Sequence, residues 1–277
     1  MTFFVQFLAR LSAQDAVLVT VQSHRGSVPR EAGAWMAVFS DHVLGTVGGG
    51  HVEWRAIKEA RQQLATGGPV QVRRYSLGPA LGQCCGGEMH LRFECVGASD
   101  LPILRQRLAD QMDTKPLVAL FGGGHVGRAL MAVLQTLPLR LLWIDSRDEI
   151  FPPDVAEHVV CEHSQPVHGA VASLPPGAHV LVMSFSHAED LDVVAACLQR
   201  QRSRADVPFI GLIGSRTKWV TFRHRLMDRS FTEAELAQVT CPIGVAGISG
   251  KEPEVIAVAV AAQLLQVAHR VASAHID

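Results

Sequence analysis

A glycine motif between a buried strand and a helix places the strongest constraint on how this chain can fold. Residues 117–121 form a short, unbroken apolar run, which is typical of a buried parallel strand. Gly122, Gly124 and Gly127 follow in the spacing G-x-G-x-x-G, and apolar residues then recur at helical spacing. The first glycine turns the chain, the second lets the backbone approach a pyrophosphate, and the third lets helix and strand pack closely. A strand, a glycine turn and a helix in this order predict a Rossmann-like unit.

The sequence constrains the ligand of this turn less than it constrains the fold. His125 lies inside the motif and is expected to face a ligand, whose phosphates would meet the N–H groups of the helix start. Residues 140–144 predict a second strand that ends at Asp145, where a dinucleotide-binding protein would hold a ribose hydroxyl pair. Arg147 leaves open NADP or a different phosphorylated ligand. A glycine turn that only joins strand and helix is the alternative.

Length, composition and charge narrow the class of protein. A chain of 277 residues favours two domains, and 48% hydrophobic residues with 18% charged residues predict a sizeable core. The formal net charge of −1 argues against nucleic acid or an anionic membrane as the main partner. No run approaches the roughly 18 apolar residues of a membrane span. The six cysteines show no secreted disulfide framework, so we expect a reduced, cytoplasmic compartment.

The order of predicted elements indicates an α/β chain with two parts. Residues 1–98 alternate short strands with one long helix and predict an α+β domain, in which residues 35–39 and 43–47 form a hairpin. Residues 99–277 alternate strands and helices, which predicts a Rossmann-like, doubly wound parallel sheet. Residues 252–272 form a long, strongly apolar helix that we expect to pack between domains or subunits. A homodimer is the expected oligomer.

Three glycine-rich loops in the first domain are candidates for a binding site: residues 25–30, 45–53 and 82–87. Glycine serves either a positive φ or a close approach of the backbone to something else, and plain turn chemistry is the alternative. If the loops converge, they would present N–H groups, Arg25, Arg30 and thiols to one anionic, sulfur-rich ligand. The candidate residues in these loops are Gly48, Gly49, Gly50, Gln83, Cys84 and Cys85.

The adjacent cysteines Cys84 and Cys85 are the most reactive-looking pair in the sequence. A disulfide between neighbours would close a strained small ring, and their spacing does not match a structural zinc site. A glycine-flanked thiolate on a loop can be a nucleophile, a sulfur carrier or a soft metal ligand. Metal binding by both cysteines is one of these three open roles, and two small buried side chains are the alternative.

A second strand–glycine–helix junction lies at residues 211–218. Ser215 is placed to cap the helix, and Lys218 adds a cation, so the junction is a reasonable phosphate seat. Cations on a solvated helix face are the alternative. His187 follows another predicted strand and stands beside carboxylates, which suits either an acid–base or metal site or a helix start with an exposed histidine.

Taken together, these motifs resemble the XdhC/CoxI family, the xanthine dehydrogenase accessory proteins, over essentially the whole chain. The matching stretches are residues 26–30, 45–53 (GTVGGGHVE), 78–87 (GPALGQCCGG), 121–127 (FGGGHVG), 143–147 (WIDSR), 211–218 (GLIGSRTK), 241–244 (CPIG) and 250–253 (GKEP). Two departures are Gly123, where the family often has alanine, and residues 184–186 before His187, where a Thr-His or similar pair is usual.

The resemblance implies a molybdenum-cofactor chaperone with no turnover of its own. Such proteins bind the molybdopterin cofactor, hold it while a cysteine desulfurase converts Mo=O to Mo=S, and pass it to apo-xanthine dehydrogenase. Cys84, Cys85 and the glycine loops are the residues that the resemblance assigns to cofactor binding. The alternative, built on the Rossmann motif, is an NAD(P)-dependent oxidoreductase or a nucleotide-sensing regulator. Whether the second domain holds the pterin phosphate or a nucleotide stays open at this point.

Overall fold

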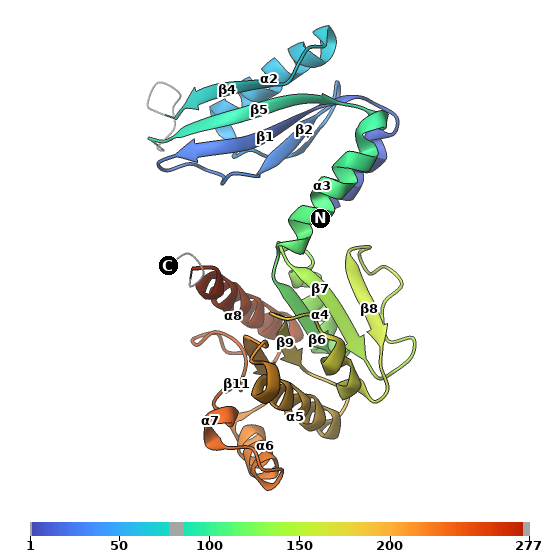
Figure 1. Ribbon diagram of the computed structural model, residues 1–277, viewed down its shortest axis with the longest axis vertical. Helices are drawn as coiled ribbons and strands as arrows, with labels where there is room; N and C mark the ends of the chain where they lie inside the picture. The colour runs from blue at the N-terminus through green and yellow to red at the C-terminus, as the bar shows by residue number, and fades with distance from the viewer. Residues whose placement is uncertain (1, 78–85, 274–277) are drawn as a thin grey trace. The chain divides into compact units, whose positions relative to one another are not determined.

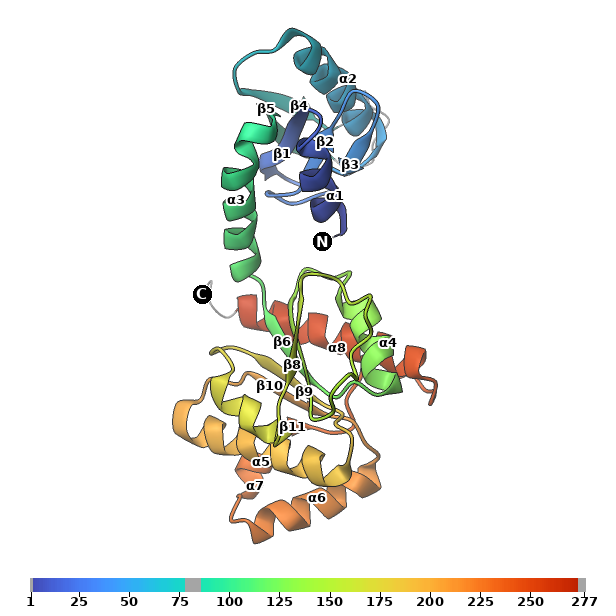
Figure 2. The same cartoon turned by 90° about the vertical axis from the view of Figure 1, so that its right-hand side faces the viewer.

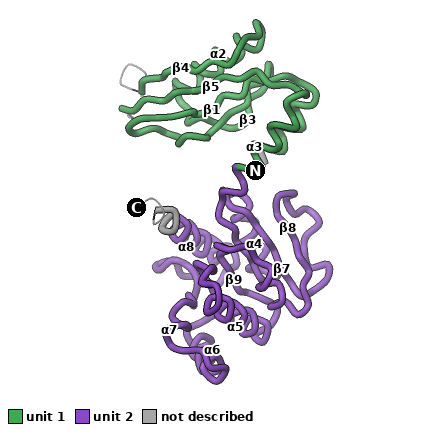
Figure 3. The backbone as a smooth tube through the Cα atoms, in the orientation of Figure 1, with its two compact units in different colours: residues 1–110 green, residues 111–277 purple. Residues whose placement is uncertain are grey.

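The computed structural model describes residues 2–77 and 86–273 of the chain. The chain divides into two compact units, unit 1 (residues 1–110) and unit 2 (residues 111–277), which Figure 3 colours separately. The division falls inside helix α3 (Leu101–Asp113), whereas the sequence analysis set the boundary just before this helix. Unit 1 carries an antiparallel sheet and unit 2 a parallel one, so the predicted α/β fold class is confirmed.

Unit 1 is built on a five-stranded antiparallel sheet in the order β3-β2-β1-β5-β4. Figure 1 labels β2, β1, β5 and β4 of this sheet. The predicted hairpin is confirmed, because Met36 of β2 lies opposite Gly45 of β3. Side chains alternate across the sheet, so one face of β5 presents buried Met89, Leu91 and Phe93 to helix α2. The strands are β1 (Ala16–Arg25), β2 (Trp35–Val38), β3 (Val43–Gly45), β4 (Gln71–Ser76) and β5 (Glu88–Val96).

Helices cover both faces of this sheet. Helix α2 (Gly50–Thr66) buries Val52, Ala56 and Ala60 on one face. On the other face, α1 (Thr2–Leu11) and α3 share a core of buried apolar side chains with the sheet. A short 3-10 helix, η2 (Ala98–Asp100), leads into α3. Unit 1 therefore has its own core on each side of the sheet.

Unit 2 is built on a six-stranded sheet in the order β11-β10-β9-β6-β7-β8, with every pairing parallel. This order runs outward from β6 in one direction and from β9 in the other, as in a dinucleotide-binding Rossmann fold. Ligands of such sheets bind outside the carboxyl ends of the strands where the order reverses, here between β6 and β9. The strands are β6 (Leu117–Phe121), β7 (Arg140–Asp145), β8 (Val159–His163), β9 (His179–Val182), β10 (Phe209–Leu212) and β11 (Val239–Thr240).

Alternating side chains of these strands feed two separate cores. Val118 and Leu120 of β6 face one core together with α4 and α8, whereas Ala119 and Phe121 face the other. Figure 2 shows α4 and α8 together on one side of the sheet and α5 on the other. The covering elements are α4 (His125–Leu134) and α8 (Pro253–Ser273) on the first face, and η3 (Val167–Ser173), α5 (His187–Arg204), α6 (Arg216–Asp228) and α7 (Glu233–Leu236) on the second.

Helix α8 belongs to the core of unit 2, because Ala257, Val260, Ala261 and Leu264 pack against α4 and the sheet. Its opposite side leaves Val258 and Leu265 exposed. The predicted place of this helix between domains or subunits stays a prediction. No helix in the described part of the chain is long and apolar enough to cross a membrane.

We expect His179, which is buried at the start of β9, to make the fold sensitive to acid. Burial lowers the pKa of His179, so the unfolded chain binds a proton at a higher pH than the folded chain does. Stability should therefore fall as the pH drops below about 6.5, by up to about 1.4 kcal/mol per pH unit. Urea unfolding at pH 5 and pH 7 should show a smaller difference for His179→Leu than for the wild type. Burial also lowers the pKa of His158, so a His158→Gln variant measures the contribution of that histidine to the pH effect separately. An equal pH effect in His179→Leu and in the wild type would contradict the assignment of acid sensitivity to His179.

Candidate functional site

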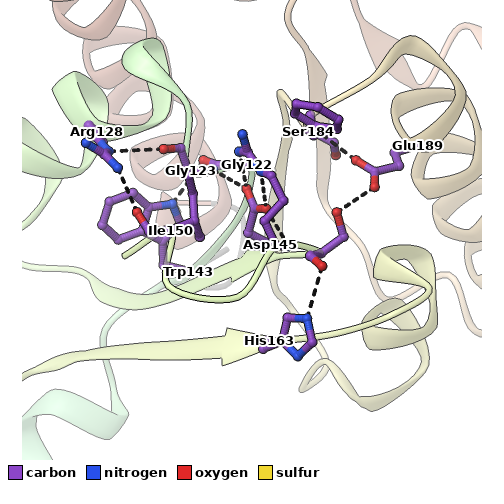
Figure 4. A network of polar contacts seen from close by, with 12 residues as sticks. Gly122, Gly123, Arg128, Trp143, Asp145, Ile150, His163, Ser184 and Glu189 are labelled. Atoms are coloured by element: carbon purple, nitrogen blue, oxygen red, sulfur yellow. Dashed lines mark hydrogen bonds and ion pairs between the residues drawn. The ribbon is translucent and has the colours of Figure 1, made fainter. Parts of the chain in front are cut away.

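Two candidate residues of unit 2, Gly122 and Asp145, lie together at the carboxyl end of the parallel sheet (Figure 4). Gly122 follows β6, and its backbone is tied to β7, because its N–H donates to Ile144 O at 2.8 Å and its O accepts from Trp143 Nε1 at 2.9 Å. Asp145 ends β7. The loop after β9 meets the same place, since a Cβ added to Gly122 would lie 2.0 Å from Met183 O. These residues therefore meet at the reversal point of the strand order.

The three motif glycines have different structural roles. Gly122 has a φ of +125°, and Gly127 approaches it so closely that a Cβ on Gly127 would lie 2.1 Å from Gly122 O. These two glycines are required by the fold itself. A Cβ on Gly124 would meet no atom within 4 Å, and its φ is −70°. The backbone at Gly124 is thus open to a ligand, beside the exposed His125 at the first position of α4.

The Asp145 carboxylate is buried, with 1% of the residue exposed, and fully hydrogen-bonded. Its Oδ2 accepts from the Gly123 N–H at 2.6 Å and from Arg147 Nη2 at 2.8 Å. Its Oδ1 accepts from the backbone N–H and the Nε of Arg147, each at 2.9 Å. Burial alone would raise the pKa of Asp145, but the hydrogen bonds from Arg147 and Gly123 lower it overall. Four donors fill the acceptor positions of a carboxylate, so this arrangement leaves none for a ribose hydroxyl pair.

A polar network extends from this carboxylate to the loop after β9 (Figure 4). The guanidinium carbon of Arg147 lies 4.6 Å from the centre of the Phe185 ring. Glu189 accepts from Ser146 Oγ at 2.5 Å and from the Phe185 N–H at 3.1 Å. His163 Nε2 lies 3.0 Å from Ser146 O. The loops after β7 and β9 are therefore joined at the reversal point. The sequence analysis placed the stretch after β9 behind a predicted strand, but it considered only His187 and the carboxylates beside it, not a contact with Arg147.

The second strand–glycine–helix junction is occupied by an internal ion pair. Ser215 caps α6 as predicted, because its Oγ accepts from the Lys218 N–H at 3.1 Å. The Lys218 ammonium donates to Asp190 Oδ2 at 2.6 Å and to Ile213 O at 2.9 Å. Asp190 Oδ1 accepts from the Ser184 N–H at 2.7 Å, which links this pair to the end of β9. A phosphate at this junction would compete with Asp190 for Lys218, so the predicted phosphate seat stays a prediction.

An open cavity of about 310 Å³ with a mixed polar and apolar lining lies beside this junction. Its walls come from the segments after β10 and β11 and from the first turns of α8. The lining includes Ile213, Pro242, Ile243, Val245, Ile248 and Val255. Burial raises the pKa of the neighbouring Cys241 thiol to about 11, so this thiol is protonated at neutral pH and is a poor nucleophile.

In unit 1 the described parts of the three glycine-rich loops contact one another, which is the condition that the sequence analysis set for a shared site. A Cβ on Gly26 would lie 3.3 Å from Gly87 Cα, and a Cβ on Gly48 would lie 2.4 Å from Pro29 Cγ. Gly48, Gly49 and Gly50 have φ values of +129°, +74° and +65°, which favour glycine at each position. The predicted site residues Gln83, Cys84 and Cys85 lie outside the described residues.

In this structure the N–H groups of residues 47–49 donate to acceptors inside the triple-glycine loop, so cofactor binding by this loop stays a prediction. Glu53 Oε2 accepts from the N–H groups of Val47 and Gly49, each at 3.0 Å, and also from the Thr46 hydroxyl. Thr46 Oγ1 in turn accepts from the Gly48 N–H at 3.0 Å. Glu53 therefore fixes the loop from inside, and an anion at this place must find other donors.

Two cations are available to such an anion. Arg25 and Arg30 are exposed, and neither makes an ion pair with an acidic side chain anywhere in the described part of the chain. Arg25 ends β1, and Arg30 lies in the loop that follows it, which touches Gly48 and Gly87. Across residues 2–77 and 86–273, no group of three or more His, Cys, Asp or Glu side chains could hold a metal ion. Metal binding by Cys84 and Cys85 stays a prediction from the sequence.

The strand order, the glycine turn and the glycine-loop unit before it define a two-unit protein with a Rossmann-like second part. Two family models match in succession: "XdhC and CoxI family" at residues 9–76 and "XdhC Rossmann domain" at residues 118–264. The chain belongs to the XdhC family.

Two comparisons place it among known proteins. The Escherichia coli (strain K12) protein YqeB, described as uncharacterized, is 26% identical over 269 residues, which are 94% of this chain and 45% of YqeB. The chain thus spans less than half the length of that relative. A Bacillus halodurans crystal structure, described as a xanthine dehydrogenase, superimposes with a TM-score of 0.75 over 96% of each chain at 18% identity, which shows a shared fold.

Proposed function

We propose that this protein is a maturation factor for xanthine dehydrogenase that carries the molybdenum cofactor as its cargo. It binds the cofactor, holds it while a cysteine desulfurase supplies the sulfur ligand of the metal, and delivers it to the apo-enzyme. Membership of the XdhC family supports a role in maturation, and the fold shared with a protein described as a xanthine dehydrogenase points to the same system. No catalytic residue of its own is needed for this role.

The observation that carries the proposal is the contact between the described parts of three glycine-rich loops beside Arg25 and Arg30, which form no ion pair within residues 2–77 and 86–273. The cofactor bears a phosphate, and guanidinium groups bind phosphate through paired hydrogen bonds. Gly49 adds open space, because a Cβ there would meet no atom within 4 Å. Glu53 keeps the triple-glycine loop in place and does not compete for Arg25 or Arg30 in this structure.

The thiols complete the proposed donor set. The Leu77 N–H donates to Gly87 O at 2.7 Å, and Gly87 lies beside Gly26. Leu77 and Gly87, described residues before and after Cys84 and Cys85, are therefore both next to the loop contact. Thiolates are soft ligands that suit a molybdenum centre bearing sulfur. We therefore assign Cys84 and Cys85 to the metal and the two arginines to the phosphate.

The test is an anaerobic titration of the whole protein with molybdenum cofactor, followed by gel filtration and measurement of bound molybdenum and pterin. Arg25→Gln with Arg30→Gln should weaken retention by about tenfold or more, because each charged hydrogen bond contributes about 1.5–3 kcal/mol. Arg61→Gln with Arg105→Gln removes two exposed arginines from helices α2 and α3 and should leave retention unchanged. Cys84→Ala with Cys85→Ala should abolish retention of molybdenum.

Delivery is measured in the same preparations. The loaded wild type should activate apo-xanthine dehydrogenase after treatment with a cysteine desulfurase, and the arginine and cysteine variants should activate it less. Failure of the wild type to retain molybdenum, or equal retention by the two arginine pairs, would contradict the proposal.

A further inference from the structure

Arg147 and Phe185 form a stacked pair at the reversal point of unit 2 that the proposed cofactor site in unit 1 does not use. Phe185 is 65% exposed and packs into neither core of unit 2, so its ring is accessible to a ligand. It follows β9, and Arg147 follows β7, so the pair spans the crevice where Rossmann-like sheets bind ligands. An exposed ring beside a guanidinium is a platform on which a planar base can stack.

The charged groups beside this platform determine whether a bound nucleotide carries a free ribose hydroxyl pair or a phosphate at the 2′ position. The Asp145 carboxylate is filled by Arg147 and Gly123, so it has no position left for a ribose hydroxyl pair. Arg147 uses its Nε and Nη2 for Asp145, and its Nη1 has no partner among the described residues. The free edge of this guanidinium favours an anion over a hydroxyl pair. A nucleotide without a 2′-phosphate would leave this edge of the guanidinium without an anionic partner.

The place for the remaining phosphates is adjacent. Asp145 Oδ2 holds the Gly123 N–H at 2.6 Å, which fixes the glycine turn next to Arg147. Within that turn the backbone at Gly124 is open, whereas Gly122 and Gly127 are closed by packing. The Ser184 hydroxyl, next to Phe185, is buried and has no hydrogen-bond partner within the described ranges, so the crevice also holds an unused polar group.

We propose that unit 2 binds a nucleotide whose ribose carries a 2′-phosphate, as in NADP, in addition to the cofactor bound by unit 1. The base stacks on Phe185, the 2′-phosphate pairs with Arg147, and the 5′-phosphates lie against the turn at Gly124. Asp145 is a positioning residue, because it orients Arg147 and the turn without touching the ligand.

The experiment is isothermal titration of the full chain with two probes that differ by one phosphate, adenosine 2′,5′-bisphosphate and adenosine 5′-monophosphate. The bisphosphate should bind at least about tenfold more tightly, the difference expected for a charge-assisted guanidinium–phosphate pair. Arg147→Gln should remove this preference, whereas Arg225→Gln, at an exposed arginine of α6, should keep it. Phe185→Ala should weaken both probes, and its exposed position means that folding is preserved.

Three results would overturn the proposal: equal binding of the two probes by the wild type, no binding of the bisphosphate at millimolar concentration, or unchanged binding by Phe185→Ala. Arg147→Lys keeps a positive charge beside Asp145 and serves as a control for folding. Thermal melting of Arg147→Lys and Arg147→Gln shows whether a weaker binding of the bisphosphate by Arg147→Gln is caused by unfolding. Molybdenum retention by Phe185→Ala should equal that of the wild type. The two proposals can therefore fail independently, and loss of molybdenum in this variant would overturn the assignment of the two ligands to separate units.

Discussion

Replacing Lys218 by methionine should lower the free energy of unfolding by about 3 kcal/mol or more. The Lys218 side chain is 12% exposed, and its ammonium pairs at 2.6 Å with Asp190, whose side chain is 4% exposed. Methionine fills a similar volume but leaves that carboxylate buried without its cation, and an uncompensated buried charge is costly. Urea unfolding of the whole chain at neutral pH measures the loss as a lower midpoint for unit 2.

Two further variants show whether the unpaired charge is the cause. Asp190→Asn in the Lys218→Met background removes the carboxylate charge and should recover part of the lost stability. Arg229→Met breaks the pair with Asp192, whose partners are 45% and 40% exposed, and should cost less than about 1 kcal/mol. Similar losses for Lys218→Met and Arg229→Met would show that burial does not set the contribution of the Asp190 pair.

The second large effect is expected at Gly122. Its φ of +125° is unfavourable for any side chain, and a Cβ would lie 2.0 Å from Met183 O, so Gly122→Val must displace the end of β9. We expect a loss of about 3–5 kcal/mol or failure of unit 2 to fold. Gly124→Val is the matched control, because its φ is −70° and a Cβ there meets nothing within 4 Å.

Thermal unfolding of the two glycine variants provides the comparison. Gly124→Val should remain within about 1 kcal/mol of the wild type, so it can also serve in ligand-binding measurements. Equal losses of stability in the two variants would contradict the conclusion that packing requires glycine at position 122 but not at position 124.

The sequence was sufficient to predict the fold because local signals and the global pattern agreed. The apolar run before Gly122 and the regular alternation after it left a parallel sheet as the consistent solution, and the structure has that sheet. The short strand β11 and helix α7 (Glu233–Leu236) were not predicted, since two to four residues carry too little periodicity to be recognised.

The details of the sites were less predictable, because side-chain partners depend on distances in space. The position of Asp145 at a strand end followed from spacing, but its capture by Arg147 and the Gly123 N–H did not. Likewise, Glu53 was visible within the glycine-rich stretch, yet nothing in the sequence showed that it would use the N–H groups of residues 47–49. The meeting of the three loops depends on the pairing of β1 with β5, which brings Arg25 opposite Glu88.

Because the motif glycines have different roles, a G-x-G-x-x-G pattern indicates the fold of a chain more reliably than it indicates ligand binding. Two of its three glycines are required by packing, so a protein of this fold that no longer bound a ligand would still need glycine at both positions. Only the middle position, Gly124 here, is free to drift once nothing approaches it. A large residue at that position in an otherwise intact pattern would therefore indicate a Rossmann-like sheet that no longer binds a ligand at its glycine turn.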